Sequence, residues 1–198
     1  EVEVCRGKTY SMRFTSSYDA KNKKWLCGIP DGPLKETGAK AGVRGTFVRF
    51  MPDDRVFETV EWNYDTIAKR LKELAFLNKG VRINFEDERV LYRTVVGEDG
   101  EESKEKLPPR DKVSYKFDGG LVDFVNYLND DKTKAYQAPL YYSDIKDITI
   151  KGFPTGKIKV EFAIQHTKED TENLYSFVNN ISTVEGGYHE TGFRSGLL

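Results

Sequence analysis

One amphipathic stretch, residues 65–78, constrains the fold of this chain most strongly. Its apolar residues recur at three- and four-residue intervals and form one face: Ile67, Leu71, Leu74 and then Ala75 or Leu77. We expect Asp65 to cap the N-terminus of this helix and Gly80 to end it, because an acceptor side chain and a residue without Cβ suit those positions. The charged residues between the apolar positions are predicted to face solvent: Lys69, Arg70, Lys72 and Glu73.

Short alternating segments surround this helix and predict strands. The predicted strands are residues 1–5, 9–14, 45–50, 81–85, 89–96, 113–117, 140–142, 145–151, 157–165 and 174–181. The first two are predicted to form a hairpin that turns at Arg6-Gly7-Lys8. A second helix is predicted over residues 120–129, and another begins after Gly187. Hairpin-linked strands mixed with a few helices indicate an α+β fold.

Two polar stretches lack a strand or helix pattern. Residues 15–44 are rich in Gly, Pro and Lys and are predicted to be a long surface loop, partly held down by Trp25 and Leu26. Residues 97–112 carry dense charge and predict either an exposed hairpin tip or a disordered insert.

Composition excludes several classes of protein. The 198 residues include 31 Lys+Arg and 32 Asp+Glu, and this balance disfavours a protein that coats nucleic acid, while leaving room for a local basic surface. The 38% hydrophobic content is enough for a core. Cys5 and Cys27 are too few for a disulfide framework or a zinc site and are expected to be free thiols. No apolar run approaches the ~18 residues of a membrane span.

The ends of the sequence are unusual. The chain opens directly in an alternating segment, Glu1 to Val4, and closes on the largely apolar Gly192 to Leu198. Natural termini tend to be polar and frayed. We therefore expect this sequence to be a piece of a longer protein.

Local motifs predict no catalytic residue and no metal ligand. Residues 152–157 have three residues between their glycines and no Ser or Thr after the lysine, so they predict a turn rather than a phosphate loop. His166 and His189 have no nucleophile at a recognisable spacing. The cluster Glu86-Asp87-Glu88 follows a strand directly and predicts a charged hairpin turn. Because adjacent side chains in a turn splay apart, these carboxylates are not expected to form a catalytic pair.

Separated segments of the sequence carry a resemblance to a known family. They are Gly45–Asp53 with Phe57-Glu58, Leu71–Ile83, Asp118–Asn129, and Phe177–Ile181 followed by Glu185–His189 and Gly192–Arg194. In this order and spacing, over about residues 40–198, they resemble the B subunits of bacterial type IIA topoisomerases, namely those of gyrase and topoisomerase IV. The residues do not separate these two branches.

The resemblance implies a domain layout. Residues 1–52 would be the C-terminal strands of a GHKL-type ATPase domain with a long loop. Residues 53–198 would be a transducer domain with a ribosomal-protein-S5-domain-2-like fold, truncated at its C-terminal end. A hinge is expected over residues 52–63.

The resemblance also implies a function. The family couples ATP binding and hydrolysis to the passage of one DNA duplex through another, with ATP and Mg²⁺ as cofactors. Its partners are the A subunit, a second B subunit and double-stranded DNA, in the cytoplasm. This chain lacks the family's Mg-binding Asn helix, adenine-binding Asp-Gly motif and ATP lid, so we expect no bound cofactor and no activity from it alone. Gln165–Lys168 imitates the family's γ-phosphate loop but precedes residues 177–181, so we reject it.

Only a few functional residues of the family can be matched to positions in this sequence. Thr46 matches a threonine that helps bind adenine, and Val48 matches its apolar neighbour. Arg6 matches, across a one-residue gap, an arginine beside the nucleotide pocket. Arg194 matches an arginine that faces DNA in the central cavity. Tyr188 stands where the family usually has threonine.

Two readings from other classes stay open. One is a non-enzymatic β-rich interaction module whose long loops form the recognition surface. The other is a stand-alone nucleic-acid binder, which the balanced charge disfavours.

Overall fold

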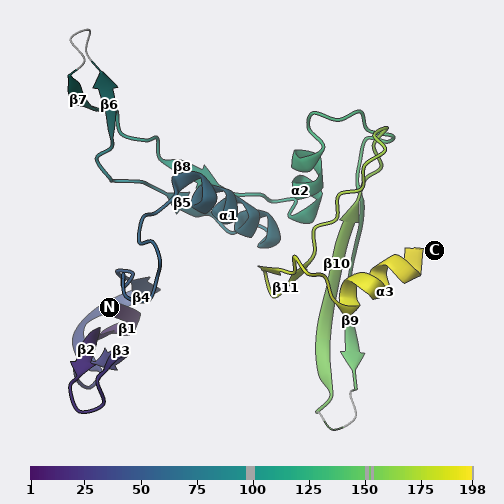
Figure 1. The fold of residues 1–198 in the computed structure, drawn as a ribbon. Helices are drawn as coiled ribbons and strands as arrows, with labels where there is room; N and C mark the ends of the chain where they lie inside the picture. The colour runs from purple at the N-terminus through teal and green to yellow at the C-terminus, as the bar shows by residue number, and fades with distance from the viewer. Residues whose placement is uncertain (97–100, 150–151, 153, 198) are drawn as a thin grey trace. The chain divides into compact units, whose positions relative to one another are not determined.

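Along the chain, groups of consecutive strands are each followed by one helix (Figure 1). The computed structural model describes residues 1–96, 101–149, 152 and 154–197. The strands are β1 (Val2–Met12), β2 (Phe14–Asp19), β3 (Lys24–Pro30), β4 (Lys35–Val48), β5 (Ile83–Phe85), β6 (Tyr92–Val96), β7 (Glu102–Lys106), β8 (Val113–Tyr115), β9 (Leu140–Ile148), β10 (Gly156–Ile164), β11 (Phe177–Val178) and β12 (Ile181–Ser182). The helices are α1 (Tyr64–Leu77), α2 (Leu121–Leu128) and α3 (Tyr188–Leu197). The predicted α+β class is confirmed.

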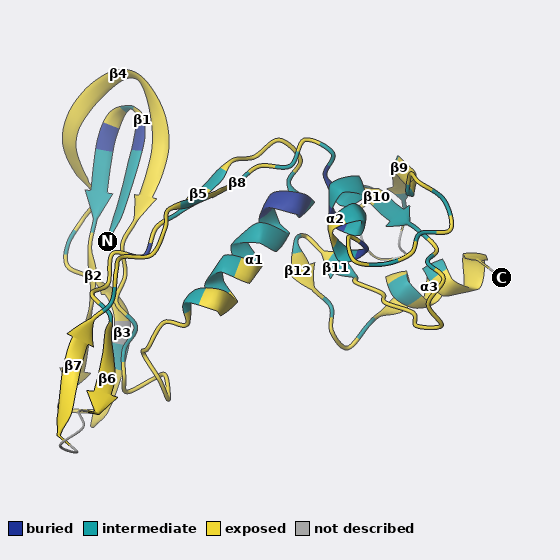
Figure 2. Ribbon diagram, turned by 90° about the horizontal axis from the view of Figure 1, so that it is seen from above, coloured by how far each residue is buried: buried dark blue, intermediate teal, exposed yellow. Residues whose placement is uncertain are grey.

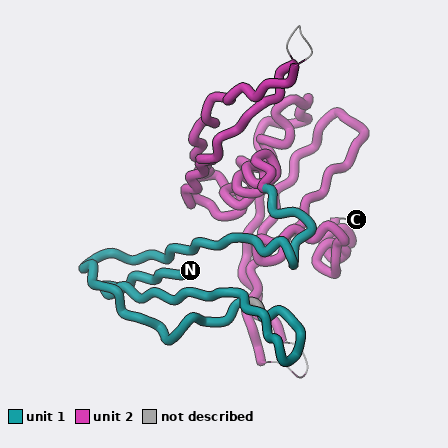
Figure 3. Tube along the Cα trace, turned by 60° about the vertical axis from the view of Figure 1, so that its left-hand side comes forward, with its two compact units in different colours: residues 1–61 teal, residues 62–198 magenta. Residues whose placement is uncertain are grey.

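The chain divides into two compact units, unit 1 (Glu1–Glu61) and unit 2 (Trp62–Leu198) (Figure 3). Unit 1 holds two antiparallel strand pairs, β1 with β4 and β2 with β3. Unit 2 holds the three described helices and the remaining antiparallel pairs, β5 with β8, β6 with β7, β9 with β10 and β11 with β12. Within the described ranges, no helix combines the length and the apolar character that crossing a bilayer requires.

The predicted hairpin over residues 1–14 is wrong, because β1 runs on through Gly7. Its register with β4 passes from Arg6 opposite Arg44 to Lys8 opposite Ala39. One residue of β1 thus faces four of β4, and Gly7 accommodates this bulge at φ +84°. The pattern that suggested a turn is instead an irregularity inside one strand.

Residues 15–44 are also not a loop, since β2, β3 and most of β4 lie within them. The β2–β3 hairpin turns where Asp19 accepts hydrogen bonds from the backbone N–H groups of Lys21 and Asn22, at 3.0 and 3.1 Å. β4 is exposed along its whole length, so its polar, glycine-containing sequence is compatible with a strand. Trp25 packs against Tyr18, as its predicted anchoring role requires.

The segment after β4 returns to the β2–β3 hairpin. Arg55 Cζ lies 3.5 Å from the centre of the Trp25 ring. The same guanidinium donates to both carboxylate oxygens of Asp53, at 2.7 and 2.5 Å, and holds the pKa of that carboxyl well below its usual range. We call the contact of Trp25, Arg55 and Asp53 the clasp. β4 itself ends at Val48, two residues before the predicted end at Phe50.

The buried residues of unit 2 include the C-terminal part of α1 and part of α2 (Figure 2), and their packing is aromatic. Phe76 of α1 is only 2% exposed and stacks on Phe117, with 3.6 Å between ring centres. It also stacks on Phe124 and Tyr127 of α2, at 5.0 and 5.5 Å. Phe124 in turn reaches Phe177 of β11, at 6.3 Å. Stacked aromatic rings therefore join the two helices to the chain around them.

Helix α1 is confirmed, but its expected cap is wrong. Asn63 is the N-cap and its side chain accepts from the Thr66 N–H at 2.9 Å, so Asp65 lies in the first turn. At the other end Asn78 is the C-cap. Gly80 takes a left-handed backbone, φ +79°, two residues later, and its N–H donates to the Phe117 carbonyl.

The charged face of α1 is only partly in solvent. Arg70 donates to the Asn180 carbonyl at 2.6 Å and forms an ion pair with Glu73 at 3.1 Å. Lys72 Nζ lies 3.8 Å from the centre of the Tyr127 ring. The prediction of a solvated face is therefore wrong for these three residues and right for Lys69, which is exposed.

Acidic residue Asp87 is buried rather than solvated, so the predicted charged turn is wrong there. Arg89 donates to both of its carboxylate oxygens, at 2.8 and 2.7 Å, and Arg110 lies 3.6 Å away. These hydrogen bonds lower the pKa of Asp87 to about 2. Arg89 also donates to the Trp62 carbonyl at 2.6 Å, which fixes the start of unit 2.

The later strands follow the prediction with adjustments. β6 and β7 pair as a hairpin, which confirms the hairpin alternative for the charged stretch; residues 97–100 lie outside the described ranges. β9 runs unbroken where two strands were predicted. The strand predicted over 174–181 is instead β11 and β12, because Asn179 and Asn180 both take positive φ. Asparagine tolerates that conformation better than most residues.

Candidate functional site

The first candidate site is one face of the β1–β4 pair. Residues directly opposite each other in an antiparallel pair share a face. The register places Val2 opposite Val48, Val4 opposite Thr46 and Arg6 opposite Arg44. The three residues assigned to nucleotide binding from sequence, Arg6, Thr46 and Val48, therefore lie on the same face of unit 1, and all three are exposed.

The chemistry of this face suits part of a nucleotide. The Thr46 hydroxyl can donate and accept, Val48 supplies apolar contact for a base, and Arg6 with Arg44 supplies positive charge. The six residues of these three pairs include no carboxylate, so the face does not fit Mg²⁺, which prefers oxygen ligands. Across the described residues, no three potential ligands gather to hold a metal ion. The sequence alone did not identify Arg44 as a site residue, because it falls at the end of residues 15–44, which were predicted to be a loop rather than part of β4.

Cys5 lies on the opposite face of β1 from Arg6 and is buried. Its Sγ lies 3.4 Å from the Val43 carbonyl and 3.6 Å from Thr9 Oγ1, which donates to it. This thiol is free, as predicted, and packs the strand pair. The side chain of Cys27 lies outside the described part of the structure.

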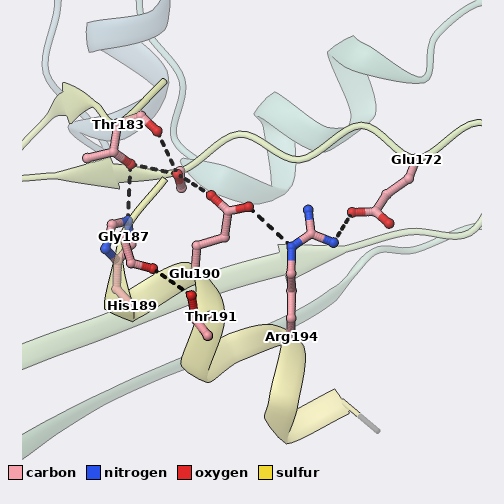
Figure 4. A network of polar contacts seen from close by, with 8 residues as sticks. Glu172, Thr183, Gly187, His189, Glu190, Thr191 and Arg194 are labelled. Carbon is pink, nitrogen blue, oxygen red and sulfur yellow. Dashed lines mark hydrogen bonds and ion pairs between the residues drawn. The ribbon is translucent and has the colours of Figure 1, made fainter. Parts of the chain in front are cut away.

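The second candidate site is a polar network at the start of α3 (Figure 4). His189 Nε2 lies 3.1 Å from Thr183 Oγ1, which lies 2.6 Å from Ser176 Oγ. Ser176 donates to Glu190 Oε2 at 3.4 Å. These bonds pin the first turn of α3 to the residues that flank the β11–β12 hairpin.

Arg194 completes the network one helical turn later. Its Nε donates to Glu190 Oε1 at 3.2 Å and its Nη1 donates to Glu172 Oε1 at 2.6 Å. The bonds to these two carboxylates raise the pKa of Arg194, so it is a cation at any working pH. Its side chain is 49% exposed.

A shallow pocket of about 410 Å³ adjoins this network. Its lining residues are Glu172, Leu174, Tyr175, Ser176, Ser182, Thr183, Val184, Glu190 and Arg194. Two carboxylates and one guanidinium give this lining a net negative charge. As it stands, the pocket repels an anion although it contains the arginine assigned to DNA.

The histidines and the rejected loop have packing roles. His166 Nδ1 lies 2.8 Å from the Tyr136 hydroxyl. Gln165 donates to the carbonyls of Tyr136 and Gln137, both at 3.1 Å, so it ties two segments together. The predicted turn over residues 152–157 includes Phe153, which lies outside the described residues.

Comparison with known proteins gives one consistent family. The sequence model described as DNA gyrase B matches residues 120–198. The DNA gyrase B protein of Cytophaga hutchinsonii is 40% identical over 170 residues, covering 86% of this chain and 31% of that protein. The DNA gyrase B protein of Streptomyces coelicolor is 37% identical over 198 residues, covering 99% of this chain and 26% of that protein. The chain thus spans less than a third of either relative.

Solved structures show the same fold. The crystal structure of the B-subunit of the DNA gyrase from Myxococcus xanthus superposes with a TM-score of 0.60 and 20% identity, covering 99% of this chain and 47% of that one. The 43K ATPase domain of Thermus thermophilus gyrase B, solved in complex with an aminocoumarin, gives a TM-score of 0.61 and 22% identity, covering 98% of this chain and 43% of that one.

Proposed function

We propose that this chain, which belongs to the DNA gyrase B family, is the part of an ATP-dependent type IIA topoisomerase B subunit that couples ATP binding and hydrolysis to DNA strand passage. The observation that carries the proposal is the 37% identity to a gyrase B protein across 99% of the chain. That continuity favours the topoisomerase over a β-rich interaction module, whose loops would have no reason to follow one family from end to end.

The domain roles follow the resemblance. Residues 1–52 would complete a GHKL-type ATPase domain, and residues 53–198 would be an S5-like transducer. The division into compact units at Glu61 and Trp62 supports a boundary after β4. In this role unit 2 transmits a movement rather than performing chemistry.

The hinge between these parts can be narrowed to residues 58–61. The clasp anchors Arg55 within unit 1, and the bond from Arg89 anchors Trp62 within unit 2. Val56 and Phe57 also donate their backbone N–H groups to the Asp53 carbonyl, both at 3.0 Å, and the four residues that follow, 58–61, are exposed and lie in no helix or strand. A short linker held at both ends is the kind of element that absorbs the dihedral changes of a domain rotation.

ATP and Mg²⁺ would serve the intact protein. Arg6, Thr46 and Val48 would contact the nucleotide from the β1–β4 face, and ATP would supply the free energy for strand passage. We assign no metal ligand to this face, and we expect the chain alone to be inactive.

Partners follow from the same role. Arg194 would contact a DNA phosphate, which is a match of charge and of hydrogen-bond geometry. The B subunit would work with an A subunit and a second B subunit on duplex DNA, in the cytoplasm.

Substituting Thr46 tests the nucleotide assignment. In the B subunit that contains this segment, Thr46→Ala should raise the KM for ATP by about 2- to 10-fold, the worth of one hydrogen bond. Thr94→Ala is the matched control, since Thr94 is also an exposed strand threonine but lies in β6. An unchanged KM for the Thr46 variant would contradict the assignment.

A further inference from the structure

A carboxylate from outside α3 accepts a hydrogen bond from Arg194, the residue assigned to DNA. Glu172 Oε1 accepts from Arg194 Nη1 at 2.6 Å (Figure 4). A guanidinium binds a carboxylate and a phosphate through the same N–H donors. We propose that Glu172 masks Arg194 against DNA, and that a backbone phosphate displaces Glu172 when the duplex binds. This inference rests on the proposed function and adds a regulatory contact to it.

The two carboxylates at Arg194 are held differently. Glu190 lies on the same helix, four residues earlier, and its other oxygen accepts from Ser176 at 3.4 Å. Glu172 precedes β11, and its side chain is 68% exposed, against 23% for Glu190. Glu190 therefore orients the guanidinium, whereas Glu172 is the partner that can leave.

The charge of Glu172 explains why its contact with Arg194 would lower the affinity for DNA. With both glutamates in place, the group of Glu172, Glu190 and Arg194 carries one net negative charge, which opposes a phosphate. Once Glu172 leaves, the remaining pair is neutral and Nη1 is available to a new acceptor. Exposed ion pairs are weak, so the mask lowers affinity by a few-fold rather than blocking the site.

Binding of this chain to a mixed-sequence duplex DNA, titrated with salt and followed by fluorescence anisotropy, tests the mask. Glu172→Gln keeps the shape of the side chain and removes its charge, and should tighten binding by about 2- to 5-fold. Asp170→Asn is the matched control, since Asp170 is exposed and two residues away. It makes the same charge change without contacting Arg194 and should have a smaller effect. Far-UV circular dichroism checks that every variant folds.

Arg194→Gln separates the claim that Arg194 contacts DNA from the claim that Glu172 masks it. It should reduce the salt slope of binding by about 1, and adding Glu172→Gln to it should give no further gain. If Glu172→Gln and Asp170→Asn bind alike, the mask is overturned, while a reduced slope in Arg194→Gln would leave the DNA contact standing. An unchanged slope in Arg194→Gln overturns the DNA contact itself. Inorganic phosphate should compete no better than chloride at equal ionic strength; stronger competition assigns the site to a free anion and also overturns the proposal.

Discussion

Phe76 lies at the centre of the aromatic packing in unit 2. It is nearly inaccessible and contacts three aromatic rings from α2 and the preceding chain. Phe76→Ala removes these contacts and leaves a cavity, so it should lower the free energy of unfolding by about 3–5 kcal/mol. Urea denaturation followed at 222 nm measures this in unit 2, because all the described helices lie there.

An exposed aromatic residue of the same unit provides the comparison. Tyr188 is 98% exposed, so Tyr188→Ala should cost well under 1 kcal/mol in the same titration. Equal losses for the two substitutions would mean that unit 2 is not held together by the aromatic cluster.

Asp87 should make the free energy of unfolding depend on pH, because its surroundings lower the pKa of its carboxyl. Its pKa is about 2 in the folded chain, against an ordinary value of 3.8. The stabilisation is therefore complete above about pH 5, declines as pH falls past the ordinary pKa, and is lost below the folded pKa, where the carboxyl is protonated in both states. Asp87→Asn should thus destabilise the chain at pH 6 and do so progressively less towards pH 2. Urea midpoints across that range measure the difference, and an identical loss at pH 6 and pH 2.5 would contradict it.

The sequence predicted the environment of a residue only where neighbours close in the sequence determine that environment. The apolar spacing of α1 predicted a helix but not Phe76, which lies beside the predicted face and is buried only because α2 and Phe117 pack against it. Arg6, Thr46 and Val48 were proposed by resemblance. That they share a face depends on pairs of residues 38 to 46 positions apart in the sequence, which no local pattern encodes.

At the scale of elements, helices were predicted better than strand pairs. Helices α1 and α2 follow from the spacing of apolar residues within one segment, whereas only the start of α3 was predicted, after Gly187. In contrast, β1 pairs with β4 rather than forming a hairpin within residues 1–14. β4 was not recognised as a strand over most of its length because it is exposed throughout, so its sequence is polar and lacks apolar alternation. Strand pairing is a long-range choice, so alternation alone could not fix the partner.

The clasp makes a prediction about the linker between the units. Endoproteinase Glu-C should cut first after Glu58 or Glu61, both exposed and outside any helix or strand. Trp25→Ala removes the surface on which Arg55 rests and should speed this cleavage, whereas Trp25→Phe keeps a ring there and should change it little. Mass spectrometry of early digests identifies the site. A first cut within a unit, or equal rates in the two variants, would contradict the narrowed hinge.

For the whole molecule, the structure separates the parts that a coupling device needs. Unit 1 carries the face assigned to nucleotide, unit 2 carries Arg194, and an exposed linker joins them. The proposed relay of ATP binding to a DNA contact requires parts of this kind. The balanced charge of the sequence disfavours a broad basic surface.

The most direct test is supercoiling of a relaxed circular plasmid by the B subunit that contains this segment, assembled with its A subunit. We predict that the topology of the plasmid changes only when ATP is hydrolysed. We also predict that Arg194→Gln weakens the stimulation of ATP hydrolysis by DNA, whereas Arg93→Gln, which alters an exposed ion pair in β6, does not. A folded assembly that, with ATP, changes the linking number of neither the relaxed plasmid nor a positively supercoiled one would contradict the account.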